Sequence, residues 1–334
     1  MNWKMKKIVI VLVFSLLSMA SFSQETNAYA FFVNVVNDNF KFPLVGFVNV
    51  AKGNHKGLQL GFVNWNARNF AGSQVGYVNT IGNNLNGVQC GFVNTTIQQM
   101  EGAQVGFVNT AMQDATGAQV GFVNTALQSI SRAQIGFVNT AMKKAPETQV
   151  GFVNIANRKE NGLQLGFVNY ADTIGDGIPI GFLSFVRRGG YKAIEYSFSE
   201  FFPVTVGFKT GVEKFYTSIY LAYNPSAGST KSMFANGIGF GSIIPLKNAF
   251  FFNPEVHSMN TIEIKNNRQL TSFVPYFGYN FNYHFSITAG PSVVWSASFD
   301  KGVLLKPVFN IANFEIDDKN SIFVGARVNV RCRF

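Results

Sequence analysis

The sequence predicts an all-β protein, in which a tandem-repeat, β-solenoid-like array is followed by a small antiparallel membrane β-barrel of about eight strands. Two observations lead to this prediction. The nine residues GAQVGFVNT that begin at Gly102 begin again at Gly117, 15 residues later. After Phe185 the repeat gives way to longer, aromatic-rich segments in which apolar and polar residues alternate. We therefore expect the array over residues 31–185 and the barrel over residues 186–334.

The N-terminus has the three-part pattern of a secretory signal. Three lysines precede the apolar run Ile8 to Leu17, and the small residues Ser21 and Ser23 precede Gln24. This order predicts a signal peptide over residues 1–23 and export from the cytoplasm. Beyond it, no apolar run reaches the length of about 18 residues that a membrane-spanning helix needs. Any insertion into a membrane must therefore use strands.

Composition and charge exclude some partners. The chain is 47% hydrophobic and only 13% charged, with a formal net charge of +10. Its basic residues are scattered, and no basic run interleaved with aromatic residues is present, so we expect no nucleic-acid binding. Cys90 and Cys332 lie far apart at apolar positions of repeating patterns. This placement favours two buried or lipid-facing thiols over a disulfide.

The repeat has a fixed interval and fixed columns. Its reference glycine recurs every 15 residues from Gly46 to Gly181 without an insertion. Glutamine stands two positions before this glycine in most copies, phenylalanine follows it, and asparagine stands three positions after it. In the two central copies these columns, to which we assign a structural role, are Gln104, Gly106, Phe107, Asn109, Gln119, Gly121, Phe122 and Asn124.

Two architectures could use such a repeat. In a parallel solenoid each coil stacks on the last at about 4.8 Å, and one inserted residue would shift every later side chain out of its column. In an antiparallel barrel, alternate strands end in different surroundings, which favours a period of two strands and loops of uneven length. The strict period favours stacking. One large barrel that includes the repeats as strands and acts as a pore remains the alternative.

Alternation along the repeat predicts two faces. Val105, Phe107 and Asn109 should lie on one face, and Gln104 and Gly106 on the other. We expect the asparagine column to bond along the stack or to turn backbone rather than to a ligand. A 15-residue coil is thin, so the phenylalanine column could also point outward. It would then form an apolar stripe that a partner, a membrane or a second sheet must cover.

The last predicted strand separates apolar from cationic residues. Ile322, Val324 and the alternate residues up to the terminal Phe334 form the apolar face. An apolar outer face with a terminal aromatic residue is typical of an outer-membrane barrel. The opposite face would point into the barrel lumen and carries Arg327, Asn329, Arg331 and Arg333.

Other alternating segments bring the barrel to eight or nine strands. They include Tyr191–Phe198, Phe234–Ile244, Phe250–His257, Leu270–Tyr279 and Val303–Ile311. The C-terminus of such a barrel normally lies in the periplasm. An even number of strands would therefore place the array in the periplasm, and an odd number would place it outside the cell.

The repeat resembles a known family. Its core, QLGFVN, QVGFVN or QIGFVN, is similar to the Q-x-G-x-x-N core of bacterial surface-repeat-containing proteins, over residues 44–184. This resemblance implies placement in the envelope or at the cell surface and no enzymatic activity. The C-terminal half separately resembles outer-membrane β-barrels. Because no lipid-modified cysteine follows the signal, anchoring would depend on the barrel.

Groups for catalysis are scarce. The three histidines do not share metal-ligand spacing, and no phosphate-binding loop or nucleophile motif is present. Glu195, Glu213 and Glu255 could face the lumen arginines, where ion pairs that fill a small barrel are a commoner role than acid–base catalysis. An envelope enzyme would need convergent polar residues that the sequence does not indicate.

We therefore expect a non-enzymatic protein without metal or cofactor, in the outer membrane of a Gram-negative-type bacterium. Outer-membrane lipid would surround the barrel. The array, anchored by the barrel, would bind or scaffold an unknown envelope or extracellular ligand through its repeated face.

Overall fold

The computed structural model describes residues 29–30, 32–225, 234–262, 268–298 and 307–334. The predicted signal peptide lies outside these residues. Strands are the regular elements of the described chain, which contains no helix capable of crossing a membrane. The chain divides into two compact units at Leu165 and Gly166. We call them the array unit, up to residue 165, and the barrel unit, residues 166–334.

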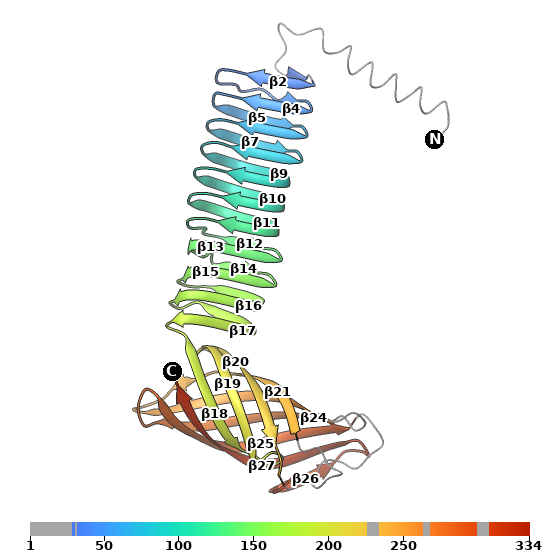
Figure 1. Ribbon diagram of the computed structural model, residues 1–334, viewed down its shortest axis with the longest axis vertical. Helices are drawn as coiled ribbons and strands as arrows, with labels where there is room; N and C mark the ends of the chain where they lie inside the picture. Colours follow the sequence, from blue (N-terminus) through green and yellow to red (C-terminus); the bar gives the residue numbers. More distant parts are fainter. Residues whose placement is uncertain (1–28, 31, 226–233, 263–267, 299–306) are drawn as a thin grey trace, which may run out of the picture. The chain divides into compact units, whose positions relative to one another are not determined.

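The strands of the array unit pair in parallel with the strand one repeat away (Figure 1). Gln104 pairs with Gln119 and Gly106 with Gly121, so the register equals the repeat. This is the predicted parallel solenoid, and the alternative of one large antiparallel barrel is wrong. Its strands are β1 (Tyr29–Ala30), β2 (Val33–Val36), β3 (Leu44–Val45), β4 (Val48–Ala51), β5 (His55–Leu60), β6 (Val63–Asn66), β7 (Phe70–Val75), β8 (Val78–Ile81), β9 (Leu85–Thr96), β10 (Met100–Ala111), β11 (Ala115–Ala126), β12 (Ala133–Ile135), β13 (Val138–Lys144), β14 (Thr148–Val150) and β15 (Val153–Lys159).

Each coil buries a small set of side chains. In the coil of β10, Met100, Gln104, Asn109 and Ala111 are almost fully buried. Two of these four are apolar and join columns that run through the stack. The other two are amides. A coil this thin therefore depends on stacked neighbours for its core, as expected for a repeat architecture.

The predicted faces of the repeat are wrong in one respect. Asn109 is buried while Phe107 is 44% exposed, and Gln104 lies inside together with Asn109. Side chains five positions apart point to opposite sides of a straight strand, so Gln104 and Asn109 can both point inward only if the alternation breaks between them, at Gly106 and Phe107. The backbone turns a corner there. A Cβ on Gly106 would lie 1.9 Å from the Gly91 carbonyl oxygen of the preceding coil, so the corner requires glycine.

The phenylalanine column points outward and stacks. The rings of Phe92 and Phe107, and those of Phe107 and Phe122, have centroids 4.8 Å apart and are nearly parallel. Val105 and Val120, which precede the corner glycines, are also exposed. The outward alternative of the sequence analysis is therefore the one adopted, and the array carries an exposed stripe of aromatic and aliphatic residues.

The barrel unit begins with repeat coils. Strand β16 (Leu163–Ile174) crosses the boundary between the units, and β17 (Ile178–Arg188) follows. We call residues 166–188 the terminal coils. The strands after them are β18 (Tyr191–Phe198), β19 (Val204–Val212), β20 (Phe215–Tyr223), β21 (Phe234–Gly241), β22 (Ile244–Pro245), β23 (Phe250–Thr261), β24 (Arg268–Asn280), β25 (Phe285–Ser298), β26 (Ala312–Glu315) and β27 (Asn320–Arg333).

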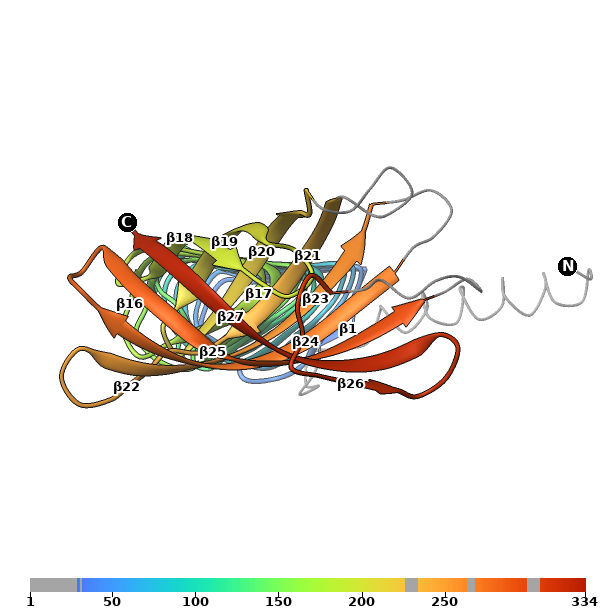
Figure 2. The same cartoon turned by 90° about the horizontal axis from the view of Figure 1, so that it is seen from below.

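Eight of these strands close an antiparallel barrel, in the order β18, β19, β20, β21, β23, β24, β25 and β27. The closing pair is β18 with β27, in which Ala193 lies opposite Arg333. Figure 2 shows the strands curving around a common interior. The strand expected over Val303–Ile311 is wrong where it can be examined, since residues 307–311 form no strand and residues 303–306 lie outside the described chain. The short β26 begins directly after these residues.

The two ends of the barrel differ in their connections. At one end, β19 joins β20 through residues 213–214, and β24 joins β25 through residues 281–284. We call this the short-turn end. The third connection at this end, residues 242–249, contains the short β22. The two longest connections of the barrel, residues 224–233 and 299–319, lie at the opposite end. Since β18 begins beside the last residues of β27, both the entry of the chain into the barrel and its C-terminus lie at the short-turn end.

Candidate functional site

The barrel interior holds a cluster of buried charges. Lys209 from β19 lies 3.1 Å from a carboxylate oxygen of Glu195 and also contacts Glu255. Arg331 donates to Glu195 through Nε at 2.9 Å and through Nη2 at 2.7 Å, and its Nη2 also donates to Asn253. Two cations thus face two carboxylates in an enclosed space. Because the charges balance, the cluster avoids the cost of an unpaired buried ion.

Two tyrosines complete this cluster. The hydroxyl of Tyr216 donates to Glu255, and that of Tyr220 donates to the other oxygen of the same carboxylate at 3.1 Å. Both rings are fully buried. Lys209 lies 5.0 Å from the centroid of the Tyr216 ring, a distance that allows a cation–π contact.

A second ion pair lies farther from the short-turn end. Arg327 donates to Glu200 at 3.2 and 3.3 Å, and Ser292 donates to the same carboxylate at 3.0 Å. Glu200 belongs to the connection between β18 and β19, which folds inward. Phe201 and Phe202 follow it and are almost fully buried. This connection therefore fills part of the lumen with a carboxylate and two aromatic rings.

The residues suggested for the lumen have different surroundings. Arg327, Asn329 and Arg331 are buried inside the barrel, and Asn329 donates to Thr288 at 2.9 Å. Arg333 is partly exposed and pairs with Glu213 at the short-turn end. The sequence reasoning missed Lys209 and Glu200. Lys209 occupies an inward position of an alternating strand, which was an available signal, whereas the inward fold of the connection that carries Glu200 has no sequence signal.

The repeat ladder is bonded along the stack. Gln119 donates to Gln104 at 2.8 Å, and Asn109 donates to Asn124 at 2.8 Å. Asn109 also donates to the carbonyl of Val120 at 2.9 Å, at the corner of the next coil. The amide columns thus bond along the stack and also satisfy backbone at the corner. These buried residues can stabilise coils but cannot reach a ligand.

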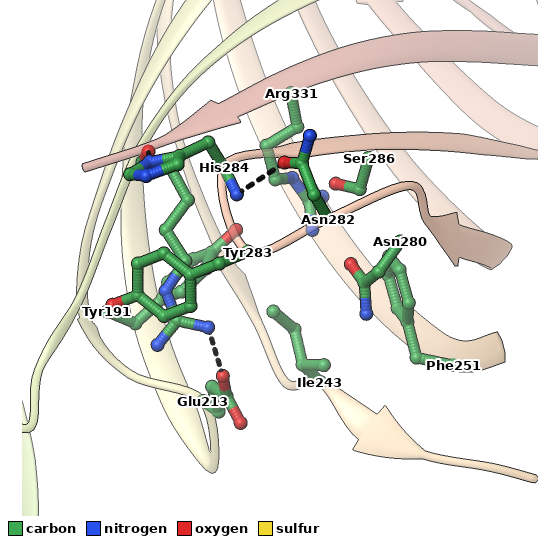
Figure 3. Close-up of a pocket in the computed structure, with 11 residues that line it drawn as sticks. Tyr191, Glu213, Ile243, Phe251, Asn280, Asn282, Tyr283, His284, Ser286 and Arg331 are labelled. Carbon is green, nitrogen blue, oxygen red and sulfur yellow. Dashed lines mark hydrogen bonds and ion pairs between the residues drawn. The ribbon is translucent and has the colours of Figure 1, made fainter. Parts of the chain in front are cut away.

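A cavity of about 260 Å³ opens at the short-turn end of the barrel (Figure 3). Tyr191 of β18, Arg331 and Arg333 of β27, and turn residues that include Glu213 and Tyr283 line it. The guanidinium carbon of Arg333 lies 4.7 Å from the centroid of the Tyr283 ring and 5.4 Å from that of Tyr191. The cavity therefore combines cationic groups with aromatic walls.

The turn that forms one wall of this cavity is held by hydrogen bonds. Asn282 accepts bonds from the backbone amides of His284 and Phe285, each at 2.8 Å. The His284 ring lies 2.9 Å from the carbonyl oxygen of Arg333. These contacts hold residues 281–284 against the last residues of β27, and so fix the wall that carries Tyr283.

The terminal coils contact the barrel strands of the same unit. Thr210 donates to the carbonyl of Ser184 at 2.6 Å, and Thr217 donates to that of Gly181 at 2.5 Å. Val212 joins a buried apolar cluster with Ala171, Ile174 and Val186. The last coils are therefore capped by β19 and β20 instead of ending on an open sheet edge.

No group of three metal-ligating side chains that could hold an ion occurs within the described residues. Of the three histidines, His55 lies in the array unit, His257 inside the barrel and His284 at the short-turn end. Comparison of the chain with protein-family models, with curated proteins and with solved structures gives no match.

Proposed function

We propose that this protein is a non-enzymatic outer-membrane protein whose barrel anchors the repeat array in the cell envelope. The reversed polarity of the barrel carries this proposal. Charged residues lie inside, while apolar residues cover the outer wall, among them Tyr196, Val206, Leu221, Phe273, Phe277, Val293, Trp295 and Val330. A soluble protein rarely exposes so large an apolar surface, whereas a membrane barrel presents such a wall to lipid.

The ends of the barrel suggest its orientation. Bacterial outer-membrane barrels have short turns on the periplasmic side and longer loops outside the cell. The chain enters β18 at the short-turn end, so the array would lie in the periplasm. This agrees with the even number of strands.

The array supplies a regular outer surface. Its exposed aromatic column is continuous from Phe92 to Phe152, with ring spacings of 4.8 to 5.0 Å. A flat, uncharged stripe of this kind suits an extended apolar or aromatic partner in the envelope. We therefore assign the array a binding or scaffolding role, with no bond-making chemistry.

A native cysteine tests the orientation. Cys90 is exposed on the array, and replacing Cys332 by serine leaves it as the single cysteine of the chain. We expect a maleimide on a polymer too large for outer-membrane pores to label Cys90 only after the outer membrane is permeabilised. A Lys319→Cys variant that also lacks both native cysteines should be labelled on intact cells, because its turn directly precedes β27 at the end of the barrel opposite the short-turn end. Labelling of Cys90 on intact cells would disprove the periplasmic placement.

A second experiment tests the membrane anchor. Val293 lies in the middle of β25 on the outer wall, and arginine there should cost about 2–4 kcal/mol at the membrane midplane. We expect Val293→Arg to reduce the heat-resistant, folded barrel recovered from outer membranes. Ile316→Arg introduces the same side chain in an exposed turn and should have little effect. Equal recovery of both variants would contradict a lipid-facing wall.

A further inference from the structure

The cavity at the short-turn end has polar features that anchoring does not require. We propose that it binds the carboxylate of a small organic acid. Three of its side chains have a buried polar atom without a hydrogen-bond partner among the described residues: the Tyr191 hydroxyl, Nη1 of Arg331 and Nε of Arg333. Tyr191 and Arg331 are each only 2% exposed.

Such unpaired donors are costly. Buried polar groups in folded proteins nearly always have a partner, and a buried donor without one loses its hydration with nothing in return. Each of the three groups can donate a hydrogen bond, and two of them belong to guanidinium groups, which match carboxylates in geometry. A carboxylate that reached these groups could accept hydrogen bonds from them, whereas a cation could not bond to the two guanidinium groups.

The surrounding charges disfavour an anion with two negative charges. Arg331 shares its carboxylates, Glu195 and Glu255, with Lys209, so these four charges cancel. Arg333 is paired with Glu213, which also lines the cavity. A dianion such as phosphate would lie close to this carboxylate without a surplus cation to compensate. A monoanionic carboxylate meets less repulsion.

The walls indicate what the acid carries. Tyr191, Phe251, Tyr283 and Ile243 supply aromatic and aliphatic surface around the polar end. At about 260 Å³ the cavity is smaller than the pockets of about 300 Å³ or more that hold drug-sized ligands. A compact acid with a flat apolar body, such as an aromatic carboxylate, fits both features.

Calorimetry on the full-length protein in detergent micelles, in a weakly alkaline buffer in which inorganic phosphate is mainly a dianion, tests this proposal with three probes: benzoate, its neutral analogue benzamide, and inorganic phosphate. We expect benzoate to bind and the other two to bind at least tenfold more weakly. Tyr191→Phe removes a hydroxyl that has no partner in the described part of the chain, so folding should be preserved. The lost bond to a charged group should weaken benzoate binding about tenfold. Arg333→Gln should weaken it further.

Arg158→Gln is the matched control, because it removes the same charge from an exposed position of the array and should leave benzoate binding unchanged. Several results would overturn the proposal. Equal binding of benzamide would mean that the carboxylate is not recognised, and equal or tighter binding of phosphate would refute the charge argument. The proposed site would also be refuted if benzoate failed to bind, or if Tyr191→Phe bound benzoate as tightly as the unaltered protein. Since Tyr191→Phe does not disturb an ion pair, this test holds even if Arg333→Gln does not fold.

Discussion

The array and barrel units bury polar side chains in opposite ways. In the array unit, identical amides lie above one another, as Gln104 and Gln119 do. In the barrel unit, unlike charges meet, as Lys209 and Glu195 do. An amide both donates and accepts, so it can bond to its own copy in the next coil. A charge repeated at the same interval would repel its copy. Closure of a barrel, in contrast, brings different residues face to face and allows charges to balance.

The largest effect should come from unbalancing the barrel charges. Glu255→Gln would leave Lys209 and Arg331 with Glu195 as their remaining carboxylate in the cluster. Breaking a buried ion pair by removing one partner costs about 3–5 kcal/mol. We expect this loss in the free energy of unfolding, measured by urea titration of the barrel in lipid vesicles.

A double substitution separates charge balance from packing. Lys209→Met combined with Glu255→Met removes one charge of each sign from the cluster. Because well-packed apolar residues can replace a buried pair at little cost, the double variant should be more stable than Glu255→Gln alone. If the double variant were the less stable of the two, charge balance would not explain the barrel interior.

A buried lysine breaks the neutral pattern of the array. Lys159 is fully buried and donates to the carbonyls of Pro146 and Glu147. Burial lowers the pKa of Lys159 from its ordinary value of 10.5 to about 8, against the smaller opposing effect of Glu147. Between pH 8 and pH 10.5 the unfolded chain therefore binds the proton more tightly. The free energy of unfolding should therefore rise as the pH increases through this window, by roughly 3 kcal/mol in total.

Hydrogen exchange of the amides in residues 144–160, corrected for the intrinsic rate at each pH, measures this rise. Lys159→Met should abolish the pH dependence, since it removes the titrating group. Lys144→Met replaces an exposed lysine of the same coil region and should leave the pH dependence of stability unchanged. A flat profile in the unaltered protein would mean that Lys159 is not held in a desolvated site.

Glycine substitutions compare the two units directly. In Gly106→Ala the new methyl group would lie 1.9 Å from a backbone oxygen that the stack holds in place. In Gly325→Ala it would lie 3.1 and 3.2 Å from the side chains of Ser292 and Glu200. Overpacking typically costs about 1–3 kcal/mol, and a fixed backbone atom cannot give way. We expect thermal unfolding to show the larger loss for Gly106→Ala. Equal losses would mean that the coils can move apart.

The sequence predicts the stacking of the array but not its cross-section. The fixed interval implied in-register columns, and the structure contains them. Alternation alone placed Phe107 and Asn109 on one face because it assumed a straight strand. Gly106 was visible as an invariant column, yet a glycine column does not say in which direction the chain turns. Only contacts with the preceding coil decide that.

The barrel illustrates the same limit. Alternation along residues 322–334 was enough to separate the outer wall from the interior. The partners inside were not predictable, because Glu200 reaches Arg327 from a connection, and such pairs depend on how the barrel closes. The cavity is assembled from the ends of five strands and from the connections between them, and no single segment of the sequence carries its pattern.

The smallest effect concerns the one imidazole of the array. His55 replaces an apolar residue in an inward column, with its ring centroid 5.6 Å from that of Phe40 and 5.4 Å from that of Phe70. Burial lowers the pKa of His55, although its bond to the Phe42 carbonyl opposes this. The unfolded chain therefore takes up the proton first, and stability should fall as the pH drops below 6.5. His55→Phe should remove this acid sensitivity, as followed by hydrogen exchange of β5 and β7. If β5 and β7 opened equally at low pH in both proteins, the loss of stability would come from groups other than His55, and burial of this imidazole would not make the array sensitive to acid.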